Sequence, residues 1–385
     1  MKSKIKIAYL SYFDVDSINY WSGCIYFMKR SLEDESTNVL PIHQLDSKID
    51  YLYKFKTLYY KQLGKNYHRL REISINKKVA RKAEKQIKNI KPDIIFSSGS
   101  LELAHIDTNV PLTFWSDATF HNIVDYYPEY SNLAKETLES GDYLERLSLQ
   151  KSRLQFFATD WSRQDSIDYY NSDPAKIFSL PFGANIKEEP NYDDIKQRIQ
   201  SKKFDKINFL FVGVDWYRKG GDIVLKLIEK LRANGVNAHL QVVGCQPPIE
   251  TNLDYIENFG YLKKSIPEEY SKLKNLYLNA HFFTMPSRFE QFGVVICEAN
   301  SMGLPALGAK TGGLQHIVKD SINGFSVDYN NIEYSLDTIN KNIIGLLSEK
   351  KDYIELALSS LNEYRTNLNW KVSGQKILQK LKEIV

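Results

Sequence analysis

Cysteine is scarce in this sequence, with three residues among 385. Cys24, Cys245 and Cys297 lie far apart and form no CxxC pair. A disulfide framework and a zinc site both need several closely spaced cysteines, so neither is indicated. We therefore expect three reduced, buried thiols and no metal.

Long hydrophobic runs are also lacking. No segment approaches the ~18 apolar residues that a membrane-spanning helix requires. The opening residues MKSKIKIAYLSYF include basic side chains but lack the apolar core and small-residue cleavage site of a signal peptide. We expect a soluble, cytoplasmic protein.

The composition is that of a globular protein: 43% hydrophobic, 25% charged and a net charge of +4. A chain of 385 residues exceeds the usual size of one hydrophobic core. We therefore expect two domains of similar size.

Short strand-like segments alternate with helix-length stretches along both halves of the chain. The first half contains KIAYL, DIIFSS, PLTFW, LQFFATD and IFSLPFG, and the second contains INFLFVGV, HLQVVGC, NFGYL, AHFFTMPS and PALGA. This alternation predicts parallel sheets with crossover helices. The fold class is therefore α/β, with two Rossmann-like, doubly wound domains.

The domain boundary is predicted near residues 185–205, which are dense in charge and lack a strand-like segment. We predict one domain over residues 1–190 and a second over residues 191–365. The last residues, 366–385, are predicted to form an amphipathic helix that returns to the first domain.

Residues 51–92 carry thirteen lysines and arginines against only Glu72 and Glu84, with tyrosines interleaved. Such a stretch could bind anionic lipid headgroups, an anionic glycan or nucleic acid, or it could be a solvated helix face. Nucleic acid is disfavoured because no recognisable nucleic-acid module accompanies the charge. The membrane alternative would place the protein at the inner face of the membrane.

The segment FLFVGVDWYRKGGDIVLKLIEKL reads as strand, tight loop and helix. Gly220 and Gly221 allow close approach to a ligand, and the N–H groups of the following helix point at the loop. Arg218 and Lys219 add cationic donors, which suits a diphosphate. Taken alone, this segment favours an exposed Arg-Lys turn over a ligand site.

A second segment, AHFFTMPSRFEQFGVVICEANSMG, places two glutamates around a helix start. Glu290 is predicted in the loop after a strand, where open α/β sheets bind ligands. Glu298 is predicted within the helix that begins near Phe292 and ends at Gly303, with Gly293 leaving room at its start. Both carboxylates could accept hydrogen bonds from the hydroxyls of one bound nucleotide-sugar.

These motifs together resemble the donor domain of family 4 retaining glycosyltransferases of the GT-B fold. The resemblance rests on E-x7-E, the FG after the first glutamate, PALGAKTGG downstream and VGVDWYRKGG upstream, and it covers residues 209–328. It implies an acceptor-side domain, a donor domain and an active site in the cleft between them.

The resemblance implies a role for each matching residue of the donor domain. Glu290 would contact the transferred sugar, and Glu298 would hold the ribose. The backbone at Phe292 and Gly293 would contact sugar or phosphate, and Lys219 would bind the diphosphate. The family's arginine usually follows the glycine after the first strand, but here Val214 follows Gly213, and Arg218 takes the arginine's place. Where the family often has a glutamate after the double glycine, this chain has His316.

The amino-terminal half resembles the family more loosely. Ser22 and Gly23 look like a one-glycine version of the loop that approaches the donor phosphates. Asp117 matches a strand-end aspartate of the active site, whereas Ser116 stands where the family has histidine. We interpret His121 as structural and the DVD at residues 14–16 as a polar loop rather than a metal site.

The resemblance implies a retaining glycosyltransferase that moves a hexose-type sugar from a UDP-, GDP- or similar nucleotide-sugar to a glycan, glycolipid or other cell-envelope acceptor. No cofactor, metal or protein nucleophile would be needed, and nucleic acid would not be a partner. Two alternatives remain, a nucleotide-sugar epimerase and a non-catalytic partner that binds a glycan or another transferase. A dinucleotide-dependent oxidoreductase is disfavoured because no GxGxxG follows KIAYL.

Overall fold

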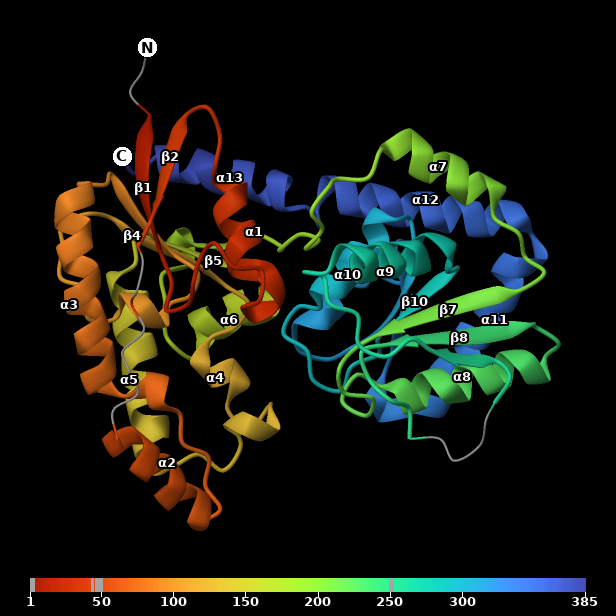
Figure 1. Cartoon of the computed structure of the whole chain (residues 1–385), viewed down its shortest axis with the longest axis horizontal. Helices are drawn as coiled ribbons and strands as arrows, with labels where there is room; N and C mark the ends of the chain where they lie inside the picture. The colour runs from red at the N-terminus through yellow and green to blue at the C-terminus, as the bar shows by residue number, and fades with distance from the viewer. Residues whose placement is uncertain (1–3, 43–44, 46–50, 249–252) are drawn as a thin grey trace. The chain divides into compact units, whose positions relative to one another are not determined.

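The computed structural model describes residues 4–42, 45, 51–248 and 253–385, and for residues 51 and 52 the backbone alone. The chain divides into two compact units (Figure 1). Unit 1 comprises Met1–Phe182 and Trp370–Val385, and unit 2 comprises Gly183–Asn369. Each unit contains a parallel sheet with helices, so the predicted α/β class with two doubly wound domains is confirmed.

Unit 1 is built on a six-stranded sheet in which every neighbouring pair is parallel. In spatial order its strands are β2 (Thr37–Pro41), β1 (Ile5–Leu10), β3 (Ile94–Ser97), β4 (Leu112–Ser116), β5 (Leu154–Phe157) and β6 (Ile177–Ser179). The central strands are buried along their whole length, which is why they appear in the sequence as continuous apolar runs. The edge strand β2 is mostly half-buried and contains Asn38 and Pro41. It therefore lacks a continuous apolar run, and it was not predicted as a strand.

The helices of unit 1 are α1 (Cys24–Ser31), α2 (Tyr51–Gln62), α3 (Ile73–Ile90), α4 (Phe120–Ile123), α5 (Lys135–Lys151), α6 (Asp160–Asp168) and α13 (Trp370–Lys382). The last helix, α13, packs on α1, so closely that a Cβ at Gly374 would lie 2.1 Å from the carbonyl oxygen of Ser31. Residues at the carboxyl terminus therefore complete the fold of unit 1.

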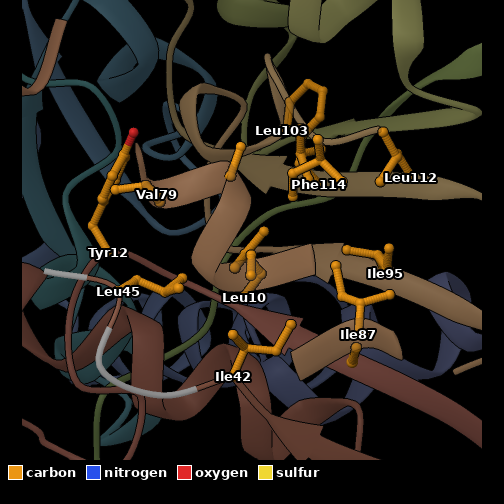
Figure 2. Packing of buried hydrophobic residues seen from close by; sticks show 14 of the residues in the cluster. Leu10, Tyr12, Ile42, Leu45, Val79, Ile87, Ile95, Leu103, Leu112 and Phe114 are labelled. Atoms are coloured by element: carbon orange, nitrogen blue, oxygen red, sulfur yellow. The ribbon is translucent and has the colours of Figure 1, made fainter. Parts of the chain in front are cut away.

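The core of unit 1 lies between α3 and the sheet. Val79 and Ile87 on the buried stripe of α3 belong to the same cluster as Leu10, Ile95 and Phe114 on the strands (Figure 2). Their spacing along α3 follows the helical period, so one face meets the sheet while the other faces solvent.

Unit 2 contains a second six-stranded parallel sheet. In spatial order its strands are β12 (Gly324–Val327), β11 (Ala306–Ala309), β10 (Phe282–Thr284), β7 (Ile207–Val212), β8 (Ala238–Val243) and β9 (Ile256–Asn258). Numbered within the unit, this is the Rossmann order, which reverses direction between β7 and β10. Of these strands, β12 was not predicted, and β9 begins before the predicted NFGYL segment.

The helices of unit 2 are α7 (Tyr192–Ser201), α8 (Gly221–Ala233), α9 (Pro267–Asn279), α10 (Val294–Ser301), α11 (Ile332–Ser348) and α12 (Lys350–Thr366). Helices α8 and α11 lie on one face of the sheet, and α9 and α10 lie on the other (Figure 1). The charged segment 185–205, predicted to link the two domains, contains α7, which packs on α12. Asn191 accepts hydrogen bonds from the backbone N–H groups of Asp193 and Asp194 and so caps α7.

The three cysteines are free thiols; Cys24 and Cys297 are buried, whereas Cys245 is half-buried. None of the helices in the described part of the chain combines the length and the apolar character needed to cross a membrane.

Candidate active site

The donor-site residues predicted in the second half of the chain lie on two loops of unit 2, except Glu298, which lies in α10. One loop follows β7 and leads into α8, and the other follows β10 and leads into α10. Because β7 and β10 are parallel neighbours, both loops leave the same edge of the sheet, at the point where the strand order reverses. Open α/β sheets bind ligands at such a switch point.

Gly213 and Gly220 allow the loop after β7 to pack tightly. A Cβ at Gly213 would lie 2.9 Å from Cγ of Lys219, so the lysine side chain lies directly over this glycine. Gly220 precedes α8 with φ +77°, and a Cβ there would lie 2.1 Å from the carbonyl oxygen of Pro286 in the loop after β10. The two loops are therefore in backbone contact, which only glycine at position 220 permits.

Lys219 and Glu290 meet across these loops. The Lys219 ammonium donates a hydrogen bond to the Glu290 carboxylate, and both side chains are largely buried. The Glu290 carbonyl in turn accepts a hydrogen bond of 3.2 Å from the N–H of Gly313. A lysine expected to bind a diphosphate and a glutamate expected to bind a sugar are thus adjacent.

Arg218 lies on the same loop and contacts the backbone of the β10 loop. One guanidinium nitrogen donates to the Phe289 carbonyl at 3.3 Å, and the Arg218 carbonyl accepts a bond of 2.8 Å from the N–H of Arg288. Arg218 therefore lies beside the residues that flank Glu290.

Glu298 lies in α10 and is almost completely buried, with 2% of its surface exposed. Lys264, from the segment between β9 and α9, donates to one carboxylate oxygen, and Tyr277 donates to the other at 3.3 Å. Burial and the neighbouring carboxylate raise the pKa of the Tyr277 hydroxyl, so it remains a donor. Lys264 was missed by the sequence analysis, because nothing in the spacing of the chain links it to Glu298.

The FG pair precedes α10, which starts two residues later than the predicted helix. The Phe292 side chain is buried, so only its backbone can reach a ligand. Gly293 caps α10 with φ +90°, and a Cβ there would lie 3.0 Å from Leu314. The first N–H groups of α10 are thereby left beside the Glu290 loop, where they could bind an anion.

Arg288 is a second residue that the sequence analysis missed. Its guanidinium forms two hydrogen bonds of 2.8 Å to the Asp222 carboxylate and lies 3.9 Å above the Tyr217 ring. The bidentate bond raises the pKa of Arg288 further above its usual value, so it is always charged. Arg288 thus joins the β10 loop to the start of α8 and fixes the positions of Lys219 and Glu290.

The candidate residues of the first half, Gly23 and Asp117, lie in unit 1. Gly23 is the residue before α1, with φ +94°, and it follows Trp21 and Ser22 at φ +49° and +55°. Asp117 follows β4, is half-buried, and its carbonyl accepts a hydrogen bond from the Ser162 hydroxyl. Asp117 directly follows β4, whereas Gly23 lies in the segment between β1 and α1.

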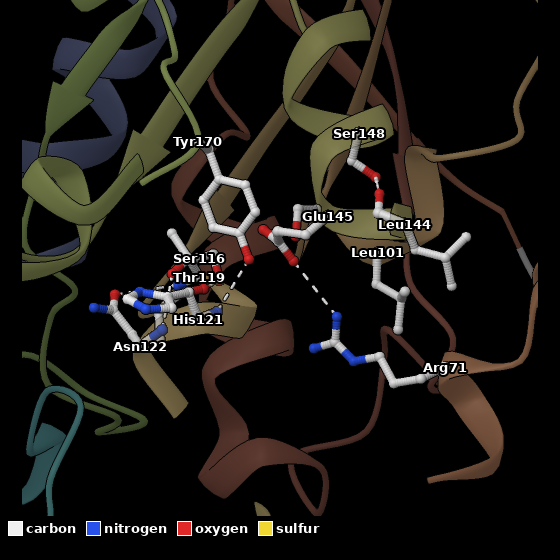
Figure 3. A network of polar contacts seen from close by, with 12 residues as sticks. Arg71, Leu101, Ser116, Thr119, His121, Asn122, Leu144, Glu145, Ser148 and Tyr170 are labelled. Carbon is white, nitrogen blue, oxygen red and sulfur yellow. Dashed lines mark hydrogen bonds and ion pairs between the residues drawn. The ribbon is translucent and has the colours of Figure 1, made fainter. Parts of the chain in front are cut away.

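His121 makes its contacts within unit 1. One ring nitrogen lies 2.6 Å from the Asp165 carboxylate, and the ring stacks on Tyr169 at 3.7 Å. The N–H of His121 also donates to the Tyr170 hydroxyl (Figure 3). These contacts favour a structural role for His121.

A buried polar network that the sequence analysis did not anticipate lies near His121. The Glu145 carboxylate accepts a bond of 2.8 Å from Ser100. It also pairs with Arg71 at 3.4 Å (Figure 3). Burial raises the pKa of Glu145, while Arg71 opposes that shift. Across the residues that the structure describes, no three histidine, cysteine or acidic side chains gather as a metal site would require.

Comparison with known proteins defines the class to which the chain is similar. Residues 193–360 match the family model described as "Glycosyl transferases group 1". A "D-inositol 3-phosphate glycosyltransferase" of Corynebacterium diphtheriae is 23% identical over 230 residues, which is 55% of this chain and 52% of that protein. The chain thus matches about half the length of such relatives.

Solved structures extend the likeness over the whole chain. A sucrose-phosphate synthase from Thermosynechococcus elongatus has a TM-score of 0.66 at 16% identity, with 99% of each chain covered. Anabaena Alr3699/HepE in complex with UDP and glucose has a TM-score of 0.62 at 16% identity, covering 98% of this chain and 100% of that chain. The fold is GT-B, as the sequence predicts, and residues 193–360 are similar to group 1 glycosyl transferases.

Proposed function

We propose that this chain is a retaining glycosyltransferase that moves a hexose-type sugar from a nucleotide-diphosphate sugar to a glycan, glycolipid or other cell-envelope acceptor. The observation that carries the proposal is the meeting of Lys219 and Glu290 at the switch point of the unit 2 sheet. Support comes from the family match over residues 193–360 and from a relative of the same fold whose structure contains UDP and glucose.

The donor is a UDP- or GDP-type sugar whose parts divide among the residues of unit 2. Glu298 accepts hydrogen bonds from the ribose hydroxyls, and Glu290 accepts them from the transferred sugar. Lys219 and Arg218 neutralise the diphosphate, together with the backbone N–H groups after Gly293. Because Lys219 already pairs with Glu290, the ammonium can shift toward the phosphate without leaving the site.

The reaction is proposed to take place on one face of the sugar. The bond between the anomeric carbon and the diphosphate breaks, the acceptor oxygen bonds to that carbon from the same side, and the acceptor proton passes to a diphosphate oxygen. The protein supplies position and charge stabilisation rather than a nucleophile. Asp117 is proposed as an active-site residue and Gly23 as part of the loop that approaches the donor phosphates, and no metal or organic cofactor takes part.

A thermal-shift screen of UDP-, GDP- and other nucleotide-sugars tests the proposal first. A ligand at 100 times its dissociation constant adds roughly 2.7 kcal/mol of stability, which is a measurable rise in melting temperature. The active donor is then incubated with the protein and candidate acceptors, and the products are separated. Free nucleoside diphosphate with a glycosylated acceptor supports transfer.

Other products would favour the alternatives. An isomerised nucleotide-sugar formed without acceptor would indicate an epimerase, and glycan binding without donor turnover would indicate a non-catalytic partner. If no nucleotide or nucleotide-sugar raises the melting temperature, the proposal fails.

A further inference from the structure

Helix α2 exposes apolar side chains on its outward face. Phe55, Leu58 and Tyr59 are 68%, 57% and 48% exposed, and Leu63, just beyond the helix, is 54% exposed. Positions 55, 58 and 59 are spaced i, i+3 and i+4, so these side chains lie on one face of the helix. Single exposed apolar residues are ordinary, but an exposed group of this kind indicates an interaction surface.

The opposite face of α2 is fixed to the rest of unit 1. Tyr53 is buried, and its hydroxyl lies 2.8 Å from that of Ser74. Lys56 pairs with Glu72 at 2.6 Å and with Glu136 at 2.8 Å. Figure 1 shows α2 at one end of unit 1. The exposed face is therefore held in a defined orientation.

Basic side chains border this apolar face. Lys54, Lys61 and Lys65 are exposed, and no aspartate or glutamate occurs between residues 51 and 71. A helix that combines exposed aromatic and aliphatic side chains with lysines fits the headgroup region of an anionic bilayer. At twelve residues, α2 is too short to span the bilayer but can lie in its surface.

Helix α3 carries most of the remaining basic residues of the stretch and differs from α2 in one respect. Its apolar residues, such as Val79 and Ile87, are buried in the core, and its exposed face carries lysines such as Lys85 and Lys88 without apolar neighbours. The structure therefore divides residues 51–92 into a solvated basic face on α3 and an amphipathic face on α2. Only the second combines charge with exposed apolar surface.

We propose that the outward face of α2 docks on an anionic membrane surface. Phe55, Leu58, Tyr59 and Leu63 enter the boundary between headgroups and acyl chains, and the lysines contact lipid phosphates. This inference goes beyond the proposed transfer reaction and does not depend on it.

Vesicle flotation of the full-length protein tests the inference. We expect binding to vesicles of phosphatidylcholine mixed with phosphatidylglycerol, weakened by salt, and none to phosphatidylcholine alone. The double variant Lys61→Ala with Lys65→Ala should lose roughly fivefold in affinity per lysine. Phe55→Ser with Tyr59→Ser should abolish stable binding. Lys85→Ala with Lys88→Ala removes the same charge from α3 and is the control. This control should lose less affinity for the vesicles than either α2 variant.

Three results would overturn the inference. The first is absence of binding to the mixed vesicles, and the second is an α3 control that loses as much affinity as the α2 lysine variant. The third is a dimeric protein that Phe55→Ser with Tyr59→Ser makes monomeric, because the face would then join two copies. The rise in melting temperature caused by nucleotide-sugar should be the same in each variant as in the unaltered protein. This measurement separates a failure of membrane binding from a failure of the proposed function.

Discussion

Glu298 is a nearly buried carboxylate that accepts hydrogen bonds from Lys264 and Tyr277, which lie 34 and 21 residues earlier in the chain. A buried charge that loses its partner is strongly disfavoured. Lys264 itself is partly exposed, so solvent moderates the loss. The lysine thus pairs with the proposed ribose-binding carboxylate and holds it in one orientation.

Lys264→Ala is expected to destabilise the protein by on the order of 2 kcal/mol and to weaken nucleotide binding, because Glu298 loses its cation. Thermal melting and a nucleotide titration measure the two effects. Lys263→Ala, which removes a neighbouring exposed lysine, is the matched control and should change neither. Equal behaviour of the two variants would show that Lys264 does not support Glu298.

The two glutamates have separable roles in the proposal. Glu298→Ala should chiefly raise the dissociation constant of the nucleotide, since the ribose loses its acceptor. Glu290→Ala should lower turnover more than nucleotide affinity, since the transferred sugar loses its contact. Nucleotide titrations and steady-state kinetics of both variants provide the test, and full activity in both would contradict the assignment.

At the scale of elements, the loop between β7 and α8 depends on its contact with the loop after β10. Gly220 and Gly235 both have left-handed φ angles, +77° and +83°, but only Gly220 lies against other backbone. Alanine at Gly235 meets no atom within 4 Å, so it should cost only the strain of its φ angle, about 1 kcal/mol. Gly220→Ala adds a clash with Pro286.

Gly220→Ala should therefore lower stability by on the order of 3 kcal/mol and remove nucleotide binding, because the loops must separate. Gly235→Ala should bind the nucleotide as tightly as the unaltered protein. Melting temperatures and a thermal shift with nucleotide-sugar check both statements. A Gly220→Ala variant that binds normally would show that the contact between the loops does not position the donor site.

His281 joins β10 to β7 and to the segment before it. One ring nitrogen accepts a 3.1 Å bond from the N–H of Asn208, and the other lies 2.7 Å from the Lys203 carbonyl. Burial lowers the pKa of His281 to about 4. The folded protein therefore keeps the imidazole neutral, whereas the unfolded chain protonates it near pH 6.5.

Acid should accordingly destabilise unit 2 between pH 6.5 and about 4, because protons bind the unfolded chain more tightly over this range. The expected loss is on the order of 3 kcal/mol. Hydrogen exchange of the β7 and β10 amides across this pH range provides the measurement. His281→Gln should be less stable at neutral pH but should lose less on acidification; an equal loss would assign the acid effect to other groups.

For the whole molecule, the local patterns of the sequence predict the repeated α/β units and place Lys219 and Glu290 at strand ends. Parallel strands bring such ends together, so this part of the site follows from sequence and topology. The pairing of Glu298 with Lys264 and that of Arg288 with Asp222 could not be predicted. Each joins segments that are distant in the sequence, and no helical or strand period relates them.

The sequence also does not determine which apolar side chains of a helix are exposed. Residues 51–92 are basic throughout, yet α3 buries its apolar side chains against the sheet while α2 leaves Phe55 and Leu58 exposed. The difference depends on which helix face meets the rest of unit 1, and only the tertiary structure decides that.

The central claim is that a nucleotide-sugar binds beside Lys219. Calorimetric titration of UDP- and GDP-sugars into the unaltered protein, Lys219→Ala and Lys226→Ala tests it most directly, since Lys226 is an exposed lysine further along α8. The account predicts one binding site, unchanged in Lys226→Ala and weakened roughly 10- to 150-fold in Lys219→Ala by loss of a charge-assisted hydrogen bond. Absence of binding, or equal affinity in the two variants, would contradict it.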